Sequence, residues 1–109
     1  MPTPHTHPFT FTEADFQRQN PAQPILVDFW PPWCGPCRVL APVIDDIAAD
    51  FEGQAIVGKV KVDEQPHLVA HYGIRAIPTL LIFHNGQIVD QAVGVVSKHV
   101  LAEKLRAIV

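Results

Sequence analysis

The sequence predicts an α/β fold in which a mixed central β-sheet is flanked by helices on both faces, in the order β-α-β-α-β-α-β-β-α. Residues 25–30 form a nearly continuous apolar run, which is typical of a strand that is covered on both faces. Residues 34–51 follow with apolar side chains at intervals of three and four, which predicts an amphipathic helix. Asn85 and Gly86 stand between two further apolar runs and predict a hairpin. The sheet should therefore combine parallel βαβ units with antiparallel strands.

The composition indicates one compact domain. The chain has 109 residues, of which 48% are hydrophobic and 17% are charged, and its formal net charge is −3. This small charge, without a run of Lys and Arg, argues against nucleic-acid binding. No apolar stretch approaches the roughly 18–20 residues of a membrane span. We expect residues 1–8, rich in Pro, His and Thr, to form an irregular lead-in to a domain over residues 9–109.

The start of the chain also bears on location. Residues 1–7 have neither the basic region nor the apolar region of a secretory signal, which predicts a cytoplasmic protein. A processed precursor would have the same start, so this alternative stays open. We expect the protein to be a monomer.

The first elements are short. Residues 9–11 predict an edge strand, and Thr12 with Asp15 resembles a capping box that opens a helix to about Gln19. Residues 20–24 predict a loop, because their two prolines cannot donate hydrogen bonds to a regular ladder.

Two adjacent prolines, Pro31 and Pro32, end the first long strand before the helix over residues 34–51. Pro42 lies inside this helix and should kink it, and Gly53 should stop it. The side chains expected on its buried face are Val39, Leu40, Val43, Ile44, Ile47 and Phe51.

The second half of the chain continues the alternation. Residues 55–62 predict a strand, a short helix follows Pro66, and residues 79–83 and 87–93 predict the two strands of the hairpin. Ser97 should cap the last helix. The side chains expected to point inward from that helix are Val100, Leu101, Leu105 and Ile108.

The two cysteines, Cys34 and Cys37, lie where the first long strand gives way to the long helix. The unpaired N–H groups at a helix start favour an anion, so a thiolate of Cys34 is favoured there, and Cys37 one turn later can close a disulfide with it. Zinc is the alternative, but tetrahedral zinc needs four ligands and no second pair follows at finger spacing. His67 and His71 could share a helix face, yet nothing places them near the cysteines. We therefore predict redox chemistry and no metal site.

Asp28 is an acid inside an apolar strand. Loss of hydration should raise its pKa above the ordinary value of about 3.9. A buried carboxyl group is costly, which suggests a role in proton transfer. An end-of-strand turn is the alternative, although Phe29 and Trp30 continue the strand beyond it.

Residues 33–37, Trp-Cys-Gly-Pro-Cys, are similar to the active-site motif of the thioredoxin family, and the resemblance extends over nearly the whole chain. One departure is Pro31, where many members have Ala; it stiffens the approach to Cys34 and puts the details of loop geometry in doubt. Further segments resemble the strand before the motif, the family's cis-proline segment and its closing hairpin, and these are residues 27–30, 72–80, 83–86 and 93–94.

The resemblance implies a role for each residue of the site. Cys34 would attack a substrate disulfide, and Cys37 would resolve the mixed disulfide. Asp28 resembles the family's buried acid beneath Cys37, and Lys59 its ammonium partner, although an ordinary lysine at a sheet edge is the alternative for Lys59. Pro78 would follow a cis peptide bond. The residues implied to contact substrate are Trp33, Gly35, Pro36, Ile74, Ala76, Ile77, Pro78 and Gly94.

The resemblance also implies partners. No bound cofactor is expected, because the redox-active Cys34–Cys37 disulfide is itself the redox centre. A flavin-dependent, NADPH-using thioredoxin reductase would recharge it, and the substrates would be disulfides of proteins such as ribonucleotide reductase, methionine sulfoxide reductases or peroxiredoxins. Two other functions stay open: an oxidase or isomerase that runs the exchange in the opposite direction, and a binding module in which the thiols are incidental.

Overall fold

The computed structural model describes residues 8–17 and 22–109, and within them the predicted order of strands and helices is confirmed. The elements are β1 (Phe9–Thr10), α1 (Glu13–Gln17), β2 (Ile25–Trp30), α2 (Gly35–Asp50), β3 (Ile56–Lys61), α3 (Pro66–His71), β4 (Thr79–His84), β5 (Gln87–Val93) and α4 (Lys98–Arg106).

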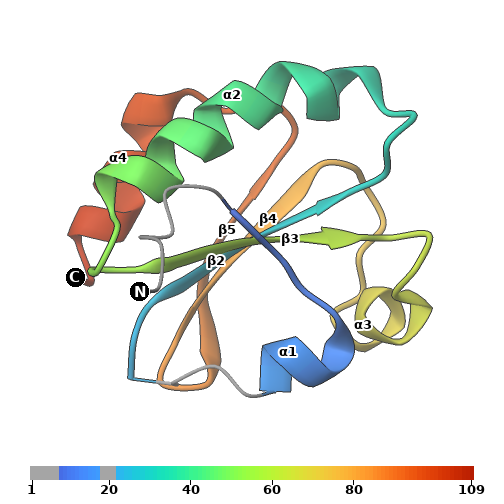
Figure 1. Cartoon of the computed structure of the whole chain (residues 1–109), viewed down its shortest axis with the longest axis horizontal. Helices are drawn as coiled ribbons and strands as arrows, with labels where there is room; N and C mark the ends of the chain where they lie inside the picture. The colour runs from blue at the N-terminus through green and yellow to red at the C-terminus, as the bar shows by residue number, and fades with distance from the viewer. Residues whose placement is uncertain (1–7, 18–21) are drawn as a thin grey trace, which may run out of the picture.

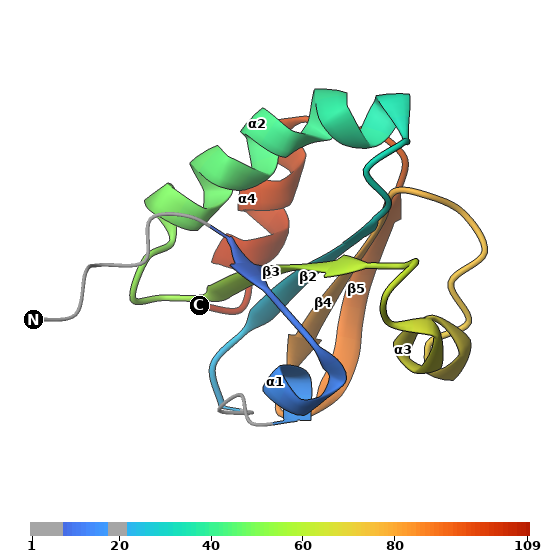
Figure 2. The ribbon, with the colours of Figure 1, turned by 45° about the vertical axis from the view of Figure 1, so that its right-hand side comes forward.

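The strands form one mixed sheet in the order β1-β3-β2-β4-β5. β3 is parallel to both β1 and β2, whereas β4 is antiparallel to β2 and to β5. Figures 1 and 2 show α2 and α4 together on one face of this sheet and α1 and α3 on the other. The predicted α/β fold, a mixed sheet flanked by helices on both faces, is therefore confirmed.

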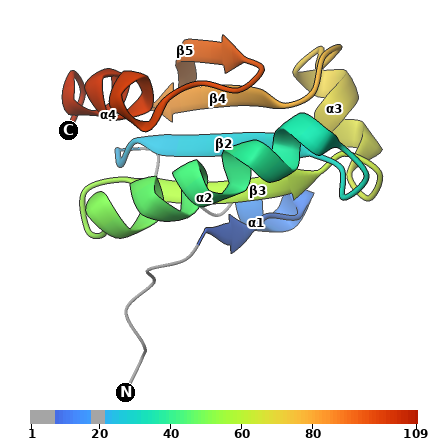
Figure 3. The ribbon, with the colours of Figure 1, turned by 90° about the horizontal axis from the view of Figure 1, so that it is seen from above.

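Each face of the sheet carries its own apolar layer. The first layer joins side chains of α2 and α4 to Leu26 of β2. The second layer joins the alternate residues Val27 and Phe29 to Phe11 and to Leu68 of α3. Since successive side chains of a strand point to opposite faces, Asp28 shares the face of Leu26 and lies on the α2 side. Figure 3 shows α2 running along this face of the sheet.

The predicted core is largely confirmed, with two corrections. Val39 of α2 and Val100 of α4 were expected to be buried, and both are exposed. The inward stripe of α2 holds Leu40, Ile44 and Ile47, and Val39 lies beside it on the outer surface. A spacing of three or four marks a wide stripe, so it does not fix which border residues are covered.

Several boundaries differ by a residue or more. Cys34 is the N-cap of α2 and the helix proper begins at Gly35, because the extended backbone of Cys34 continues the loop from β2. α2 continues through Pro42 to Asp50. The expected lead-in over residues 1–8 and the expected end of α1 near Gln19 fall largely outside the described residues. No helix in the described ranges has the length and apolar character needed to cross a membrane.

Gly58 lies in β3, opposite Phe9 of the short strand β1. A Cβ atom at Gly58 would overlap ring carbons of Phe11, whose side chain is itself buried. Because Gly58 has no side chain, the ring of Phe11 can pack against β3 within the second apolar layer. This packing attaches the N-terminal segment to the sheet.

We predict that Gly58→Ala lowers the free energy of unfolding by about 1–3 kcal/mol, because the buried ring of Phe11 cannot move away without losing its own contacts. Urea unfolding checks this value. In a Phe11→Ala background the same substitution should cost much less, since the overlapping ring is gone. An equal cost in both backgrounds would mean that strand conformation, and not this contact, excludes alanine.

Candidate active site: a cysteine pair above a buried acid

Cys34 and Cys37 are joined by a disulfide at the N-terminus of α2, with a Cα–Cα distance of 5.2 Å. Cys34 caps the helix, and its Sγ accepts a hydrogen bond of 3.2 Å from the backbone N–H of Cys37. Pro36 lies in the first turn, where its missing N–H leaves no helical bond unmade. The helix start thus directs N–H groups at the sulfur of Cys34, which stabilises a thiolate there once the bond is reduced.

Both sulfur-bearing residues are largely covered in this oxidised form. Cys34 is 5% exposed and Cys37 is 2% exposed when the two are bonded to each other. The Cys34 side chain turns inward onto the helix start, where it is bonded to Cys37. The exposed surface around the pair is supplied by its neighbours Gly35, Pro36 and Trp33.

The loop before the cysteines is held by two sets of hydrogen bonds. The backbone N–H of Cys34 donates to the Pro31 carbonyl at 3.3 Å, and the Arg38 guanidinium donates to the Pro32 carbonyl through two nitrogens. Trp33 is 67% exposed, and its indole N–H donates to Asp63 Oδ2 at 3.1 Å. Asp63, in the segment after β3, was missed by the sequence analysis because only the fold brings it beside Trp33.

The segment before β4 reaches the same end of the sheet. The Ile77–Pro78 peptide bond is cis, as expected. Phe29, near the end of β2, is the register partner of Thr79 at the start of β4, so Pro78 lies at the end of the sheet from which the chain enters α2. The Thr79 hydroxyl donates to the Ala76 carbonyl, and the Gly94 N–H donates to the Pro78 carbonyl at 2.9 Å.

A small cavity adjoins this loop. Its volume is about 170 Å³, and the residues that line it include Ile74, Ala76, Thr79 and Val93. Of the residues that the family resemblance implies to contact substrate, Ile74 and Ala76 line this cavity. Pro78 and Gly94 are joined by the backbone hydrogen bond described above.

Asp28 lies at the centre of β2 and is fully buried. No donor among the described residues forms a hydrogen bond with either carboxylate oxygen. Burial raises the pKa of Asp28 from 3.8 to about 6, and the positive charge of Lys59 opposes part of this rise. Both the direction of this shift and its main cause, burial, are those expected from the sequence.

Lys59 is the register partner of Asp28 on β3. Because β3 lies between β1 and β2, the alternative of a lysine at a sheet edge is wrong. Its ammonium group lies 4.3 Å from the centre of the Trp30 ring, and no ion pair in the described part of the chain joins it to Asp28. Lys59 therefore acts on Asp28 through its field and not through a direct bond.

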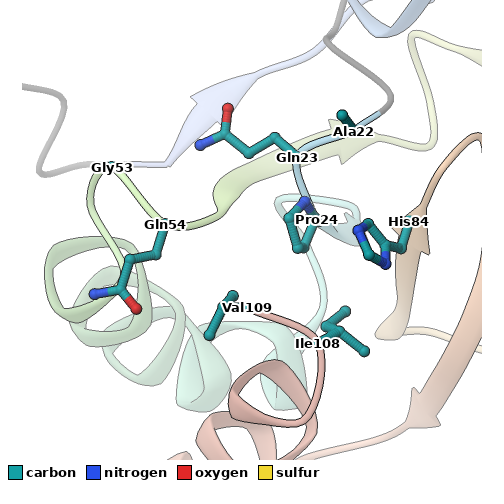
Figure 4. Close-up of a pocket in the computed structure, with 8 residues that line it drawn as sticks. All are labelled: Ala22, Gln23, Pro24, Gly53, Gln54, His84, Ile108 and Val109. Atoms are coloured by element: carbon teal, nitrogen blue, oxygen red, sulfur yellow. The ribbon is translucent and has the colours of Figure 1, made fainter.

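A larger cavity of about 470 Å³ lies at the opposite end of the sheet, where β2 begins and α4 ends (Figure 4). The residues that line it include Gln23, Pro24, Gln54, His84 and Ile108. It contains neither cysteine and is separated from them by the length of β2. Across residues 8–17 and 22–109, no three His, Cys, Asp or Glu side chains are grouped closely enough to hold a metal ion.

Comparison with known proteins gives the family. The Thioredoxin family model matches residues 7–107. The chain belongs to the thioredoxin family. It is 57% identical over 96 residues to Thioredoxin 1 of Nostoc sp., covering 86% of this chain and 90% of that protein. It is 50% identical over 99 residues to Thioredoxin 2 of Chlorobaculum tepidum, covering 89% and 91% respectively.

A solved structure gives the same result. A mutant thioredoxin from Halobacterium salinarum superposes with a TM-score of 0.88 at 29% identity, covering 99% of this chain and 96% of that chain. Membership in the thioredoxin family, together with the close cysteine pair, makes the protein a thiol–disulfide oxidoreductase. Such a family also implies disulfide-containing substrates and a reductase as partners.

We predict that Asp28→Asn raises the free energy of unfolding at pH 7 by up to about 3 kcal/mol, because the wild-type carboxyl group titrates near 6 when folded and near 3.8 when unfolded. Between these two values the folded state binds more protons than the unfolded state. The stability of the wild type should therefore fall as the pH rises from about 4 to about 6, and the variant should lack this fall.

Urea unfolding of the oxidised protein from pH 4 to pH 8 measures this dependence, because the disulfide-bonded cysteines do not titrate. Asp45→Asn, which removes an exposed carboxylate from α2, is the matched control and should leave the pH dependence unchanged. Parallel curves for the wild type and Asp28→Asn would contradict the assignment.

Proposed function

We propose that this chain reduces protein disulfides, with Cys34 as the nucleophile, Cys37 as the resolving thiol and Asp28 as the proton acceptor and donor. The observation that carries the proposal is a cysteine pair at a helix start, on the sheet face where a fully buried acid has a pKa of about 6. The acid lies in β2, and the nucleophile lies at the start of the next element, α2.

In the first step, the thiolate of Cys34 attacks one sulfur of the substrate disulfide. A bond forms between Cys34 Sγ and that sulfur, the substrate S–S bond breaks, and the other substrate sulfur leaves as a thiolate that takes up a proton. The N–H groups at the start of α2, with the dipole of this 16-residue helix, favour the attacking thiolate.

In the second step, Cys37 loses its proton and attacks Cys34 Sγ. The Cys34–Cys37 disulfide forms, and the second substrate sulfur leaves as a thiolate that takes up a proton from water. The substrate has gained two electrons and two protons. The cysteine pair has lost two electrons and two protons, one released to water when Cys34 forms its thiolate and one given up by Cys37. The carboxylate of Asp28 receives the Cys37 proton, because a base with a pKa near neutral can both accept and return a proton.

The substrate would bind across the exposed surface around the cysteines. We propose that it contacts Trp33, Gly35 and Pro36, which are exposed beside the cysteines. We also propose contacts with Ile74, Ala76, Ile77, Pro78 and Gly94, in the segments held together by the Thr79–Ala76 and Gly94–Pro78 hydrogen bonds. Trp33 is fixed by Asp63, and the loop by Thr79, so the surface is pre-formed. Recognition through an exposed indole and backbone edges fits an extended peptide next to a disulfide.

The partners we propose follow from this cycle. The oxidised pair must regain two electrons, which a flavin-dependent, NADPH-using thioredoxin reductase would supply, and no cofactor needs to be bound. Substrates of the proposed kind are ribonucleotide reductase, methionine sulfoxide reductases and peroxiredoxins. A reductase of this kind would act in the cytoplasm, where thiols are kept reduced.

We predict that Cys34→Ser abolishes reduction of insulin disulfides, because the attacking sulfur is gone, whereas Cys37→Ser accumulates as a mixed disulfide with insulin. Turbidity reports the reduction, and the mass of the intact adduct reports the trapped intermediate. Cys37→Ser turning over at the wild-type rate would contradict the resolving role. A double variant, Cys34→Ser/Cys37→Ser, should form no adduct; retained function in that variant would indicate a binding module.

A further inference from the structure

The Lys59 ammonium group lies over an indole ring and not on the carboxylate beside it. Lys59 and Asp28 are register partners on adjacent parallel strands. Even so, no ion pair within residues 8–17 and 22–109 joins them, and both Asp28 oxygens lack a donor. Lys59 Nζ is instead 4.3 Å from the centre of the Trp30 ring, which is within the range of a cation–π interaction.

Trp30 is well placed to compete for this ammonium group. It follows Asp28 by two residues in β2, so both side chains point to the same face of the sheet. The buried Nε1 of Trp30 has no acceptor in the described part of the chain, although a buried indole N–H usually finds one. Trp30 therefore interacts with its polar neighbours here through the face of its ring, by the cation–π contact with Lys59.

We propose that Trp30 is a positioning residue for the proton chemistry of Asp28: its ring holds the Lys59 ammonium group near the carboxyl group but off it. This inference rests on the proposed role of Asp28. A direct ion pair would keep the carboxylate ionised and make it a poor proton acceptor. An ammonium group held on the ring attracts the carboxylate through its field but donates no hydrogen bond to it, so both protonation states stay accessible.

Among the charged groups near Asp28, Lys59 is the one whose position affects the pKa of the carboxyl group. On β3, Lys61 is the partner of Trp30, but its Nζ is 5.9 Å from the ring centre. α2 contributes Cys34 and Cys37, which do not titrate in the disulfide form, and β4 places the apolar Leu80 opposite Asp28. Lys59 is accordingly the charge that lowers the pKa of Asp28, against the larger effect of burial.

The test is the titration of the Asp28 carboxyl carbon by NMR in the oxidised protein, in four forms: wild type, Trp30→Leu, Lys59→Met and the double variant. Trp30→Leu releases the ammonium group to approach Asp28, so the pKa of Asp28 should fall by about half a pH unit. Lys59→Met should raise this pKa. In the Lys59→Met background, Trp30→Leu should lower it much less. Equal shifts in the two backgrounds, or no shift in either, would overturn the proposal.

Two further variants make the result specific. Lys61→Met in place of Lys59→Met should leave the effect of Trp30→Leu intact, because Lys61 is the more distant ammonium group. Trp30→Phe keeps a weaker aromatic face and should give an intermediate pKa; it also replaces Trp30→Leu in the cycle if that variant does not fold. A pKa of Asp28 in Trp30→Phe outside the interval between wild type and Trp30→Leu would count against the ring as the cause.

Activity separates this proposal from the one on which it rests. The pH at which insulin reduction is half-maximal should follow the pKa of Asp28 through the variants. Suppose that Trp30→Leu lowers the pKa of Asp28 only when Lys59 is present, while the pH profile of insulin reduction stays unchanged. That result would support positioning by Trp30 and would contradict proton transfer by Asp28.

Discussion

Asp28 is a carboxylic acid within β2, the central strand of the sheet. Neither of its carboxylate oxygens accepts a hydrogen bond from a donor among the described residues. Water is the best solvent for a carboxylate, so this placement disfavours the ionised form and moves its pKa to about 6. The apolar layer around it, formed by side chains such as Leu40 and Leu80, keeps the acid dry. The fold therefore carries an acid whose ionised form is unfavourable where it lies.

The topology brings the rest of the site to this acid. β2 ends at Trp30, and the next element, α2, begins one loop later with the cysteine pair at its start. Since β4 is antiparallel to β2, the beginning of β4 lies beside the end of β2, which places Pro78 at the same edge. β5 returns along β4, so Gly94 arrives there as well and bonds to Pro78. Segments distant in sequence thus meet because strand directions alternate on this side of the sheet.

The sequence predicted the elements and the chemistry well, because both depend on local pattern. The apolar run around Asp28 already indicated burial, and burial alone determines the direction of its pKa shift. What the sequence could not show depends on contacts between segments. Asp63 bonds to Trp33, and the Lys59 ammonium group lies on Trp30, and neither partner is marked by spacing along the chain. Val39 is exposed for a related reason, since a helical period does not define where the covered stripe ends.

The role that we propose for Asp28 is to take the proton of Cys37 as the mixed disulfide resolves. Mixing the reduced protein with an aromatic disulfide in a stopped-flow instrument releases two coloured thiols, the first on attack by Cys34 and the second on resolution by Cys37. In the wild type, the second phase should accelerate as the pH rises through about 6, where Asp28 ionises. In Asp28→Asn this phase should be slower at pH 7 and should lose that inflection. Identical second phases in the two proteins across pH 5 to 8 would contradict the account.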